Sequence, residues 1–123
     1  MIIRIIILPS LFFLFLSNLY AQDITGIWNT PGNRSEIKIF KTETCYAGKI
    51  VKQEKPFDKN GNPKKDIHNP NPKFRNRLLN GLIIMKIFFF DKKRNKGSGV
   101  IYNPENGKTY KMNIELIGEN TLE

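Results

Sequence analysis

Lys108-Thr-Tyr-Lys-Met-Asn-Ile-Glu-Leu116 is the stretch that decides the fold class. Its apolar side chains stand at every second position, and polar side chains fill the positions between them. Successive residues of a strand point to opposite faces of a sheet, so this alternation indicates a strand with one face on a core. The apolar set is Tyr110, Met112, Ile114 and Leu116. The stretch therefore predicts a β-strand and not a helix.

The residues before this strand predict its partner in a hairpin. Gly99-Val-Ile-Tyr102 is rich in residues that favour strands, and Asn103-Pro-Glu-Asn-Gly107 joins it to Lys108. Asparagine and glycine accept the positive φ angles that tight turns need. We therefore expect an antiparallel hairpin with its loop at residues 103–107.

Further strands are predicted upstream. Residues 36–40 alternate, with Ile37 and Ile39 expected on the inner face, and residues 46–52 are their expected partner. Residues 82–90 are almost all apolar, which predicts a strand with both faces covered over part of its length. The charged residues 91–96 follow as a solvated turn. Short strands separated by turn signals predict an all-β fold, a barrel or a sandwich.

The first 21 residues differ in composition from the rest of the chain. Arg4 is their only charge, an apolar run follows it, and the small Ala21 precedes the polar Gln22. A positive start, an apolar stretch and a small residue at the exit are the parts of a secretory signal peptide. We expect residues 1–21 to form a signal-peptide helix that is cleaved between Ala21 and Gln22.

A retained membrane anchor is the alternative for this segment. A spanning helix needs about 20 continuous apolar residues, and Pro9, Ser10, Ser17 and Asn18 interrupt the run. We therefore expect one domain, residues 22–123, with no transmembrane anchor after cleavage. Its expected location is the periplasm or the outside of the cell.

Charge and cysteine content exclude several classes of site. The formal net charge is +9, or +8 without Arg4, but the cations are spread along the sequence and export makes nucleic acid an unexpected partner. Cys45 is the only cysteine and His68 the only histidine. An internal disulfide and the ordinary zinc sites are thereby excluded. We expect Cys45 to be a buried or half-buried structural thiol.

Catalytic and cofactor-binding motifs are missing from the chain. It has no nucleophile elbow, no zinc-protease histidine pair and no phosphate-binding loop. Asp58-Lys-Asn-Gly-Asn-Pro-Lys-Lys-Asp66 has oxygen-bearing side chains at alternating positions, as calcium loops do, but its glycine stands fourth instead of sixth. Asn, Gly and Pro also form turns without an ion. We expect no enzyme activity, no cofactor and no metal.

The segment from Lys55 to Asn80 is long, and rich in proline, asparagine and lysine. A connection of this length in a compact domain is usually functional or mobile. Asp66, Asn69 and Arg75 could clamp a polar ligand there, with the guanidinium as a bidentate donor. The alternative is a series of Asx–Pro turns held by a pair between Asp66 and Arg75.

Gly26-Ile-Trp28 predicts a first strand near the expected mature N-terminus. A glycine two residues before a tryptophan lets the backbone pack closely while the indole fills one end of a core. The indole could instead stack on a bound ligand.

Taken together, these segments resemble a bacterial exported family known as domain of unknown function 2147. The resemblance runs from about Ile24 to the end. The residues that carry it are Ala21-Gln-Asp-Ile-Thr-Gly-Ile-Trp28, Gly48-Lys-Ile-Val51, Asp58-Lys-Asn-Gly-Asn-Pro63, Asp66, Asn69-Pro-Asn-Pro72, Arg75, Gly81-Leu82 and Gly99-Val-Ile-Tyr-Asn-Pro-Glu-Asn-Gly-Lys-Thr-Tyr110.

The resemblance implies a small antiparallel up-and-down barrel of lipocalin- or calycin-like character. No activity, ligand or catalytic residue is established for the family, so none carries over. The family usually has a proline within the segment that here is residues 75–81. Its chains also continue past the position of Leu122 with strands that complete the sheet. We therefore expect a C-terminally truncated chain whose barrel is incomplete.

Two functions remain open. The first is a non-catalytic binding module for a small apolar or amphipathic ligand, with Trp28, Tyr102 and Tyr110 as wall residues and residues 55–80 at the mouth. The alternative is a structural or interaction protein of the cell envelope, whose barrel is filled by its own side chains. The sequence predicts no oligomeric state.

Overall fold

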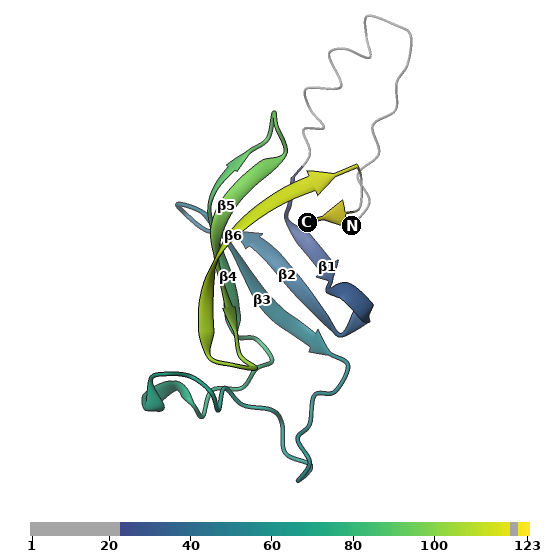
Figure 1. Ribbon diagram of the computed structural model, residues 1–123. Coiled ribbons are helices and arrows are strands. Elements are labelled where there is room, and N and C mark those ends of the chain that lie inside the picture. Colours follow the sequence, from purple (N-terminus) through teal and green to yellow (C-terminus); the bar gives the residue numbers. More distant parts are fainter. Residues whose placement is uncertain (1–22, 119–120) are drawn as a thin grey trace, which may run out of the picture.

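Seven antiparallel strands form one sheet in the computed structural model, which describes residues 23–118 and 121–123. The strands are β1 (Gly26–Asn29), β2 (Ser35–Lys41), β3 (Tyr46–Gln53), β4 (Ile83–Asp91), β5 (Lys96–Asn103), β6 (Lys108–Ile117) and β7 (Thr121–Leu122). Each strand pairs with its neighbour in the chain, so the order in the sheet is the order in the sequence. The sheet curls into a half-barrel with β1 and β7 at its edges (Figure 1). The expected all-β, up-and-down fold is confirmed.

Helical structure in the described residues consists of two short 3-10 turns, η1 (Pro31–Asn33) and η2 (Pro72–Phe74). No helix within these residues has the length and apolar character needed to cross a bilayer. The expected signal-peptide helix, residues 1–21, and the expected cleavage between Ala21 and Gln22 lie outside the described residues.

The predicted hairpin is confirmed as β5 and β6. Gly99 lies opposite Met112, and Gly97 lies opposite Ile114. Gly107 has a φ angle of 72°, and its N–H donates to the carbonyl of Asn103 at 2.8 Å, which closes the turn. The expected strands at residues 36–40 and 46–52 are confirmed as β2 and β3.

Apolar side chains fill one end of the half-barrel, where β2, β4 and β6 end and β3 begins. The buried cluster consists of Ile24, Ile39, Tyr46, Ile87, Ile114 and Leu116. Trp28 packs partly buried against this cluster, and its indole N–H donates to the carbonyl of Ile24 at 2.8 Å. The tryptophan on the first strand thus fills one end of the core, as its sequence context predicts.

Cys45 is half-buried immediately before β3. Its Sγ lies 3.2 Å from the hydroxyl of Thr42, and its N–H donates to the same hydroxyl at 3.0 Å. The expectation of a half-buried thiol in a structural setting is confirmed.

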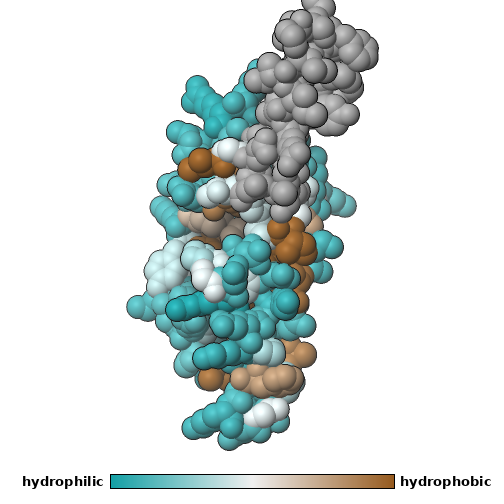
Figure 2. Space-filling model, turned by 90° about the vertical axis from the view of Figure 1, so that its right-hand side faces the viewer, coloured by the Kyte–Doolittle hydropathy of each residue, from teal (hydrophilic) through white to brown (hydrophobic). Residues whose placement is uncertain are grey.

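Strand β4 differs from its sequence expectation, because its outer face is not covered. Ile83, Phe88 and Phe89 are 48%, 59% and 62% exposed. One cause is a bulge: Ile87 lies opposite Gly99 and Phe89 opposite Ser98, so Phe88 is an extra residue without a partner. Apolar side chains therefore reach solvent on this strand. The face in Figure 2 is mostly hydrophilic, with separate apolar patches along its length.

Candidate functional site

A cavity of about 940 Å³ lies at the end of the half-barrel opposite to the apolar cluster. Part of its lining is apolar and comes from three strands and the long loop: Ile37 on β2, Ile50 on β3, Ile84 on β4 and Leu79 in the loop. Its volume falls within the range of about 300–1,000 Å³ that is typical of small-molecule sites. We take this cavity as the candidate functional site.

A second bulge in β4 brings Ile84 into the cavity. Met85 lies opposite Gly48 and Ile83 opposite Lys49, so Ile84 has no partner on β3. A bulge inserts an extra residue, bends the strand and re-aims a side chain. Ile84 consequently lines the cavity, whereas its neighbour Ile83 is 48% exposed and does not.

The rest of the lining is polar and comes mainly from loops. It includes Thr30, Ser35, Asn62 and Asn103, which offer hydroxyl and amide groups. The charged lining residues are Arg34, Lys55, Lys64 and Lys65, against Glu54, Asp58 and Glu105. Four cations against three carboxylates give a small positive excess. An apolar floor below charged groups suits a molecule with an apolar body and a polar head.

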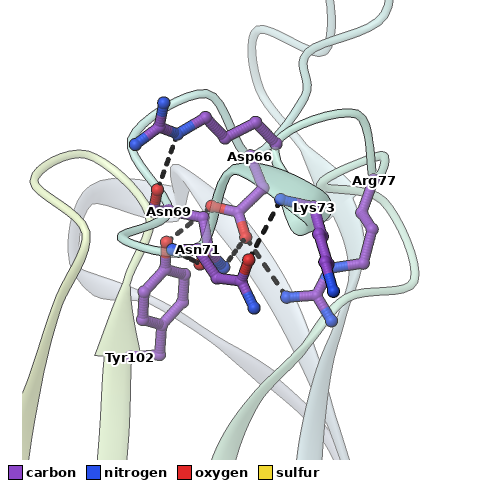
Figure 3. A network of polar contacts seen from close by, with 7 residues as sticks. Asp66, Asn69, Asn71, Lys73, Arg77 and Tyr102 are labelled. Atoms are coloured by element: carbon purple, nitrogen blue, oxygen red, sulfur yellow. Dashed lines mark hydrogen bonds and ion pairs between the residues drawn. The ribbon is translucent and has the colours of Figure 1, made fainter.

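A buried carboxylate, Asp66, organises the loop beside the cavity (Figure 3). The side chain is 0% exposed. One carboxylate oxygen accepts from the hydroxyl of Tyr102 at 2.6 Å, and the other accepts from the amide of Asn69 at 2.8 Å and the guanidinium of Arg77 at 3.4 Å. Three donors from two parts of the chain thus compensate the burial of one negative charge.

The Asx turns expected in this loop are confirmed. The Oδ1 of Asn69 accepts from the N–H of Asn71 at 2.8 Å, and the Oδ1 of Asn71 accepts from the N–H of Lys73 at 3.1 Å, where η2 begins. The Nε of Arg75 donates to the carbonyl of Asn69 at 2.8 Å. Each turn therefore has a side-chain partner.

The expected pair between Asp66 and Arg75 is wrong, because the arginine beside the carboxylate is Arg77. The N–H of Asp66 donates to the carbonyl of Arg77 at 2.9 Å, and the N–H of Leu79 donates to the carbonyl of Lys64 at 2.9 Å. This local antiparallel pairing places Arg77 directly across from Asp66. Sequence spacing alone does not reveal such a pairing.

The buried network fixes part of the cavity wall. Ile67 and His68 line the cavity and lie between two members of the network, Asp66 and Asn69. On the other side, a Cβ at Gly107 would clash with the carbonyl oxygen of His68, so the loop packs closely on the β5–β6 turn. The wall is thus held at two places by contacts outside the cavity.

Burial and the hydrogen bond to Asp66 raise the pKa of Tyr102 from 10.0 to about 12. The unfolded chain has the ordinary tyrosine pKa, so the folded state holds this proton more tightly. The stability that this hydroxyl contributes is therefore fully present below pH 10 and is lost as the pH rises towards 12.

We expect Tyr102→Phe to remove this part of the alkaline destabilisation. The measurement is urea unfolding of the unmodified protein and the variant at several pH values on either side of pH 10. All other ionisable groups are the same in the two proteins, so the difference in their free energies of unfolding reports on Tyr102 alone. Parallel stability curves over that range would contradict the assigned role. Tyr110→Phe serves as the control, because that hydroxyl is on an exposed side chain.

None of the six residues that the sequence suggests for ligand binding lines the cavity. Asp66, Asn69, Arg75 and Tyr102 come together in the network. Trp28 lies in the core, and Tyr110 is 45% exposed with its hydroxyl accepting from Asn106 at 2.8 Å. Their direct contact with a ligand stays a prediction.

Few sequence patterns point to the residues that do line the cavity. The alternation in β2 places Ile37 on the inner face. No local pattern distinguishes Arg34, Asn103 or Glu105, because they come from turns that only the fold brings together.

The loop compared above with a calcium site is closed by its own hydrogen bonds. The carboxylate of Asp58 accepts from the N–H of Asn60 at 2.9 Å and of Asn62 at 3.0 Å. No cluster of three or more His, Cys, Asp or Glu side chains suited to a metal ion occurs within residues 23–118 and 121–123.

Comparison with known proteins agrees with the fold. A solved structure, described as "Protein HP1028 from the human pathogen Helicobacter pylori belongs to the lipocalin family", matches with a TM-score of 0.66 and 24% identity, over 82% of this chain and 69% of that one. No curated protein matches. The family described as "Uncharacterized protein conserved in bacteria (DUF2147)" matches residues 26–123. The chain therefore belongs to this bacterial family, DUF2147, and has a lipocalin-like fold.

Proposed function

We propose that the protein is an exported, non-catalytic binding module that holds a small amphipathic ligand in the cavity at the loop end of the half-barrel. The observation that carries the proposal is an apolar floor and a charged rim within one cavity of about 940 Å³. A ligand gains free energy when its apolar part leaves water, and its polar head remains solvated at the rim.

The fixed wall supports a binding role. Asp66 holds the backbone on both sides of Ile67 and His68 before any ligand arrives. A preformed wall loses little conformational entropy on binding, so more of the contact energy remains as affinity. The small positive excess at the rim favours a ligand head that is polar or negative.

A structural or interaction protein of the cell envelope is the second candidate. The observation in its favour is the other end of the half-barrel, which is filled by its own side chains, Ile39, Ile87 and Ile114 among them. The two functions differ in one measurable respect, because only a binding module takes up a ligand at the loop end.

We expect Ile84→Trp to weaken binding of laurate, a simple amphipathic probe, by at least about tenfold. The indole would occupy space that the apolar tail needs, and Ile84 is only half-buried, so the core is left intact. The measurement is titration calorimetry on the full-length protein. Ile83→Trp is the matched control, because the adjacent side chain is exposed and lies outside the cavity.

Saturable binding that is lost in Ile84→Trp and retained in Ile83→Trp supports the binding module. If the unmodified protein takes up neither laurate nor a lysophospholipid, the envelope candidate is favoured instead. Equal affinity in the two variants would place the probe elsewhere on the chain and would also contradict the proposal.

A further inference from the structure

The loop of residues 55–80 gathers positive charge at one end of the molecule. Its cations are Lys55, Lys59, Lys64, Lys65, Lys73, Arg75 and Arg77. Its carboxylates are Asp58 and Asp66, and Asp66 is fully buried. Seven cations against two carboxylates give +5, more than half of the net charge of +9 for the whole chain. One segment at one end of the molecule thus carries more than half of the net charge.

Exposed apolar side chains occupy the same loop. Ile67 is 63% exposed, Phe57 58%, Leu78 49% and Phe74 42%. The guanidinium of Arg77 lies over the ring of Phe74, 4.3 Å from its centroid. The lower end of the molecule in Figure 2, where this loop lies in Figure 1, shows apolar side chains set among hydrophilic ones. A surface that only has to keep the protein in solution does not need bulky apolar side chains beside cationic ones.

The loop cannot relieve this exposure by folding onto the sheet, because its backbone is fixed. The N–H of Lys64 donates to the carbonyl of Pro56 at 3.0 Å, and the N–H of Leu79 donates to the carbonyl of Lys64 at 2.9 Å. Asp66 anchors the same segments to Tyr102 on β5. The ammonium groups of Lys55, Lys59 and Lys65 have no ion-pair partner within the described part of the chain.

We propose that residues 55–80 form a docking surface for an anionic lipid bilayer. Unpaired lysines attract the negative head groups, and each contributes about 1 kcal/mol near such a surface. The apolar side chains enter the region just below the head groups, where their burial adds to the charge attraction. A nucleic acid or an acidic polysaccharide would use the cations but leave Ile67 and Leu78 in water. The docking surface shares Lys55, Lys65 and Ile67 with the lining of the cavity, but the proposal needs no ligand in the cavity.

The test uses the full-length protein and sedimentation with vesicles of phosphatidylcholine, either alone or mixed with phosphatidylglycerol. We expect the triple variant Lys55→Gln, Lys59→Gln and Lys65→Gln to weaken partitioning onto the mixed vesicles by roughly 100-fold, since about 1 kcal/mol per lysine is about fivefold. The matched control removes the same charge from the opposite end of the sheet through Lys92→Gln, Lys93→Gln and Lys96→Gln. This control variant should bind the mixed vesicles nearly as tightly as the unmodified protein does.

A second pair of variants tests the apolar contribution. Phe57→Ser should weaken partitioning at least about tenfold, because burying a phenylalanine side chain is worth roughly 1.5–3 kcal/mol. Phe88→Ser, which alters a ring of similar exposure on β4, should leave it unchanged. Residues 1–21 are common to all variants, so the differences report on the loop alone.

Three outcomes would overturn the proposal. The first is an equal effect of the two triple variants, which would mean that only net charge matters. The second is equal binding to vesicles with and without phosphatidylglycerol. The third is tight binding of heparin, an acidic polysaccharide, together with no effect of Phe57→Ser on vesicle binding, which would identify a site for soluble polyanions.

Discussion

Asp66→Ala is expected to lower the free energy of unfolding by about 3–5 kcal/mol. The carboxylate is fully buried and accepts hydrogen bonds from Tyr102, Asn69 and Arg77. Alanine would leave the buried Asn69 and the half-buried Tyr102 without their acceptor, and each unsatisfied buried group costs about 1–3 kcal/mol, whereas the half-exposed Arg77 can turn to water. The loss is large because one side chain joins the loop to the sheet.

Urea unfolding measures the global effect, and amide hydrogen exchange in residues 64–79 measures local opening of the loop. Asp58→Ala is the control, because that carboxylate is exposed and accepts only from backbone groups of its own turn. We expect it to cost about 1 kcal/mol or less. A similar small cost for Asp66→Ala, with unchanged exchange in the loop, would show that the network does not hold the wall.

Gly99→Ala is expected to destabilise the sheet by about 3 kcal/mol or more, at the upper end of what overpacking costs. A Cβ at this position would clash with the carbonyl oxygen of Lys86 and lie 2.8 Å from the Cα of Ile87. Both obstacles are backbone atoms of β4, so no side-chain rotation relieves them. The two strands would have to separate at Ile87, which is 0% exposed in the core.

Thermal unfolding of Gly99→Ala beside Ser98→Ala tests this expectation. Ser98 is the neighbouring residue, is exposed and has a Cβ already, so its substitution should change stability by less than about 0.5 kcal/mol. Equal midpoints for the two variants would contradict the close approach of β4 and β5. Failure of Gly99→Ala alone to accumulate as folded protein would agree with it.

The sheet could be predicted from the sequence wherever one face of a strand is buried and the other faces solvent. β6 has that character, and the turn before it carries Gly107 at a positive φ angle. The strand β4 could also be predicted, but the exposure of its side chains could not. Its continuous apolar run predicts two covered faces, while bulges at Ile84 and Phe88 decide which side chains are exposed. A bulge depends on the register between two strands, and the sequence of one strand does not contain it.

The candidate site was less predictable than the sheet. The polar segment around Asp66 and Asn69 stands out in the sequence, but its role in the structure is to hold neighbouring residues in place. The guanidinium beside Asp66 belongs to Arg77 because of a local strand-like pairing that the spacing to Arg75 conceals. The cavity lining comes from separate strands and turns, so its composition follows from tertiary structure alone.

The order of strands in the sheet also bears on how the chain folds. Each strand pairs with the next strand in the chain. Where the loop between the two is short, it closes at small entropic cost, and such local contacts form quickly. The connection from β3 to β4 is the exception, because residues 54–82 lie between them. We therefore expect β1–β3 and β4–β7 to form as two separate units. Asp66 lies in this connection, and its hydrogen bond to Tyr102 on β5 fastens the connection to the unit of β4–β7.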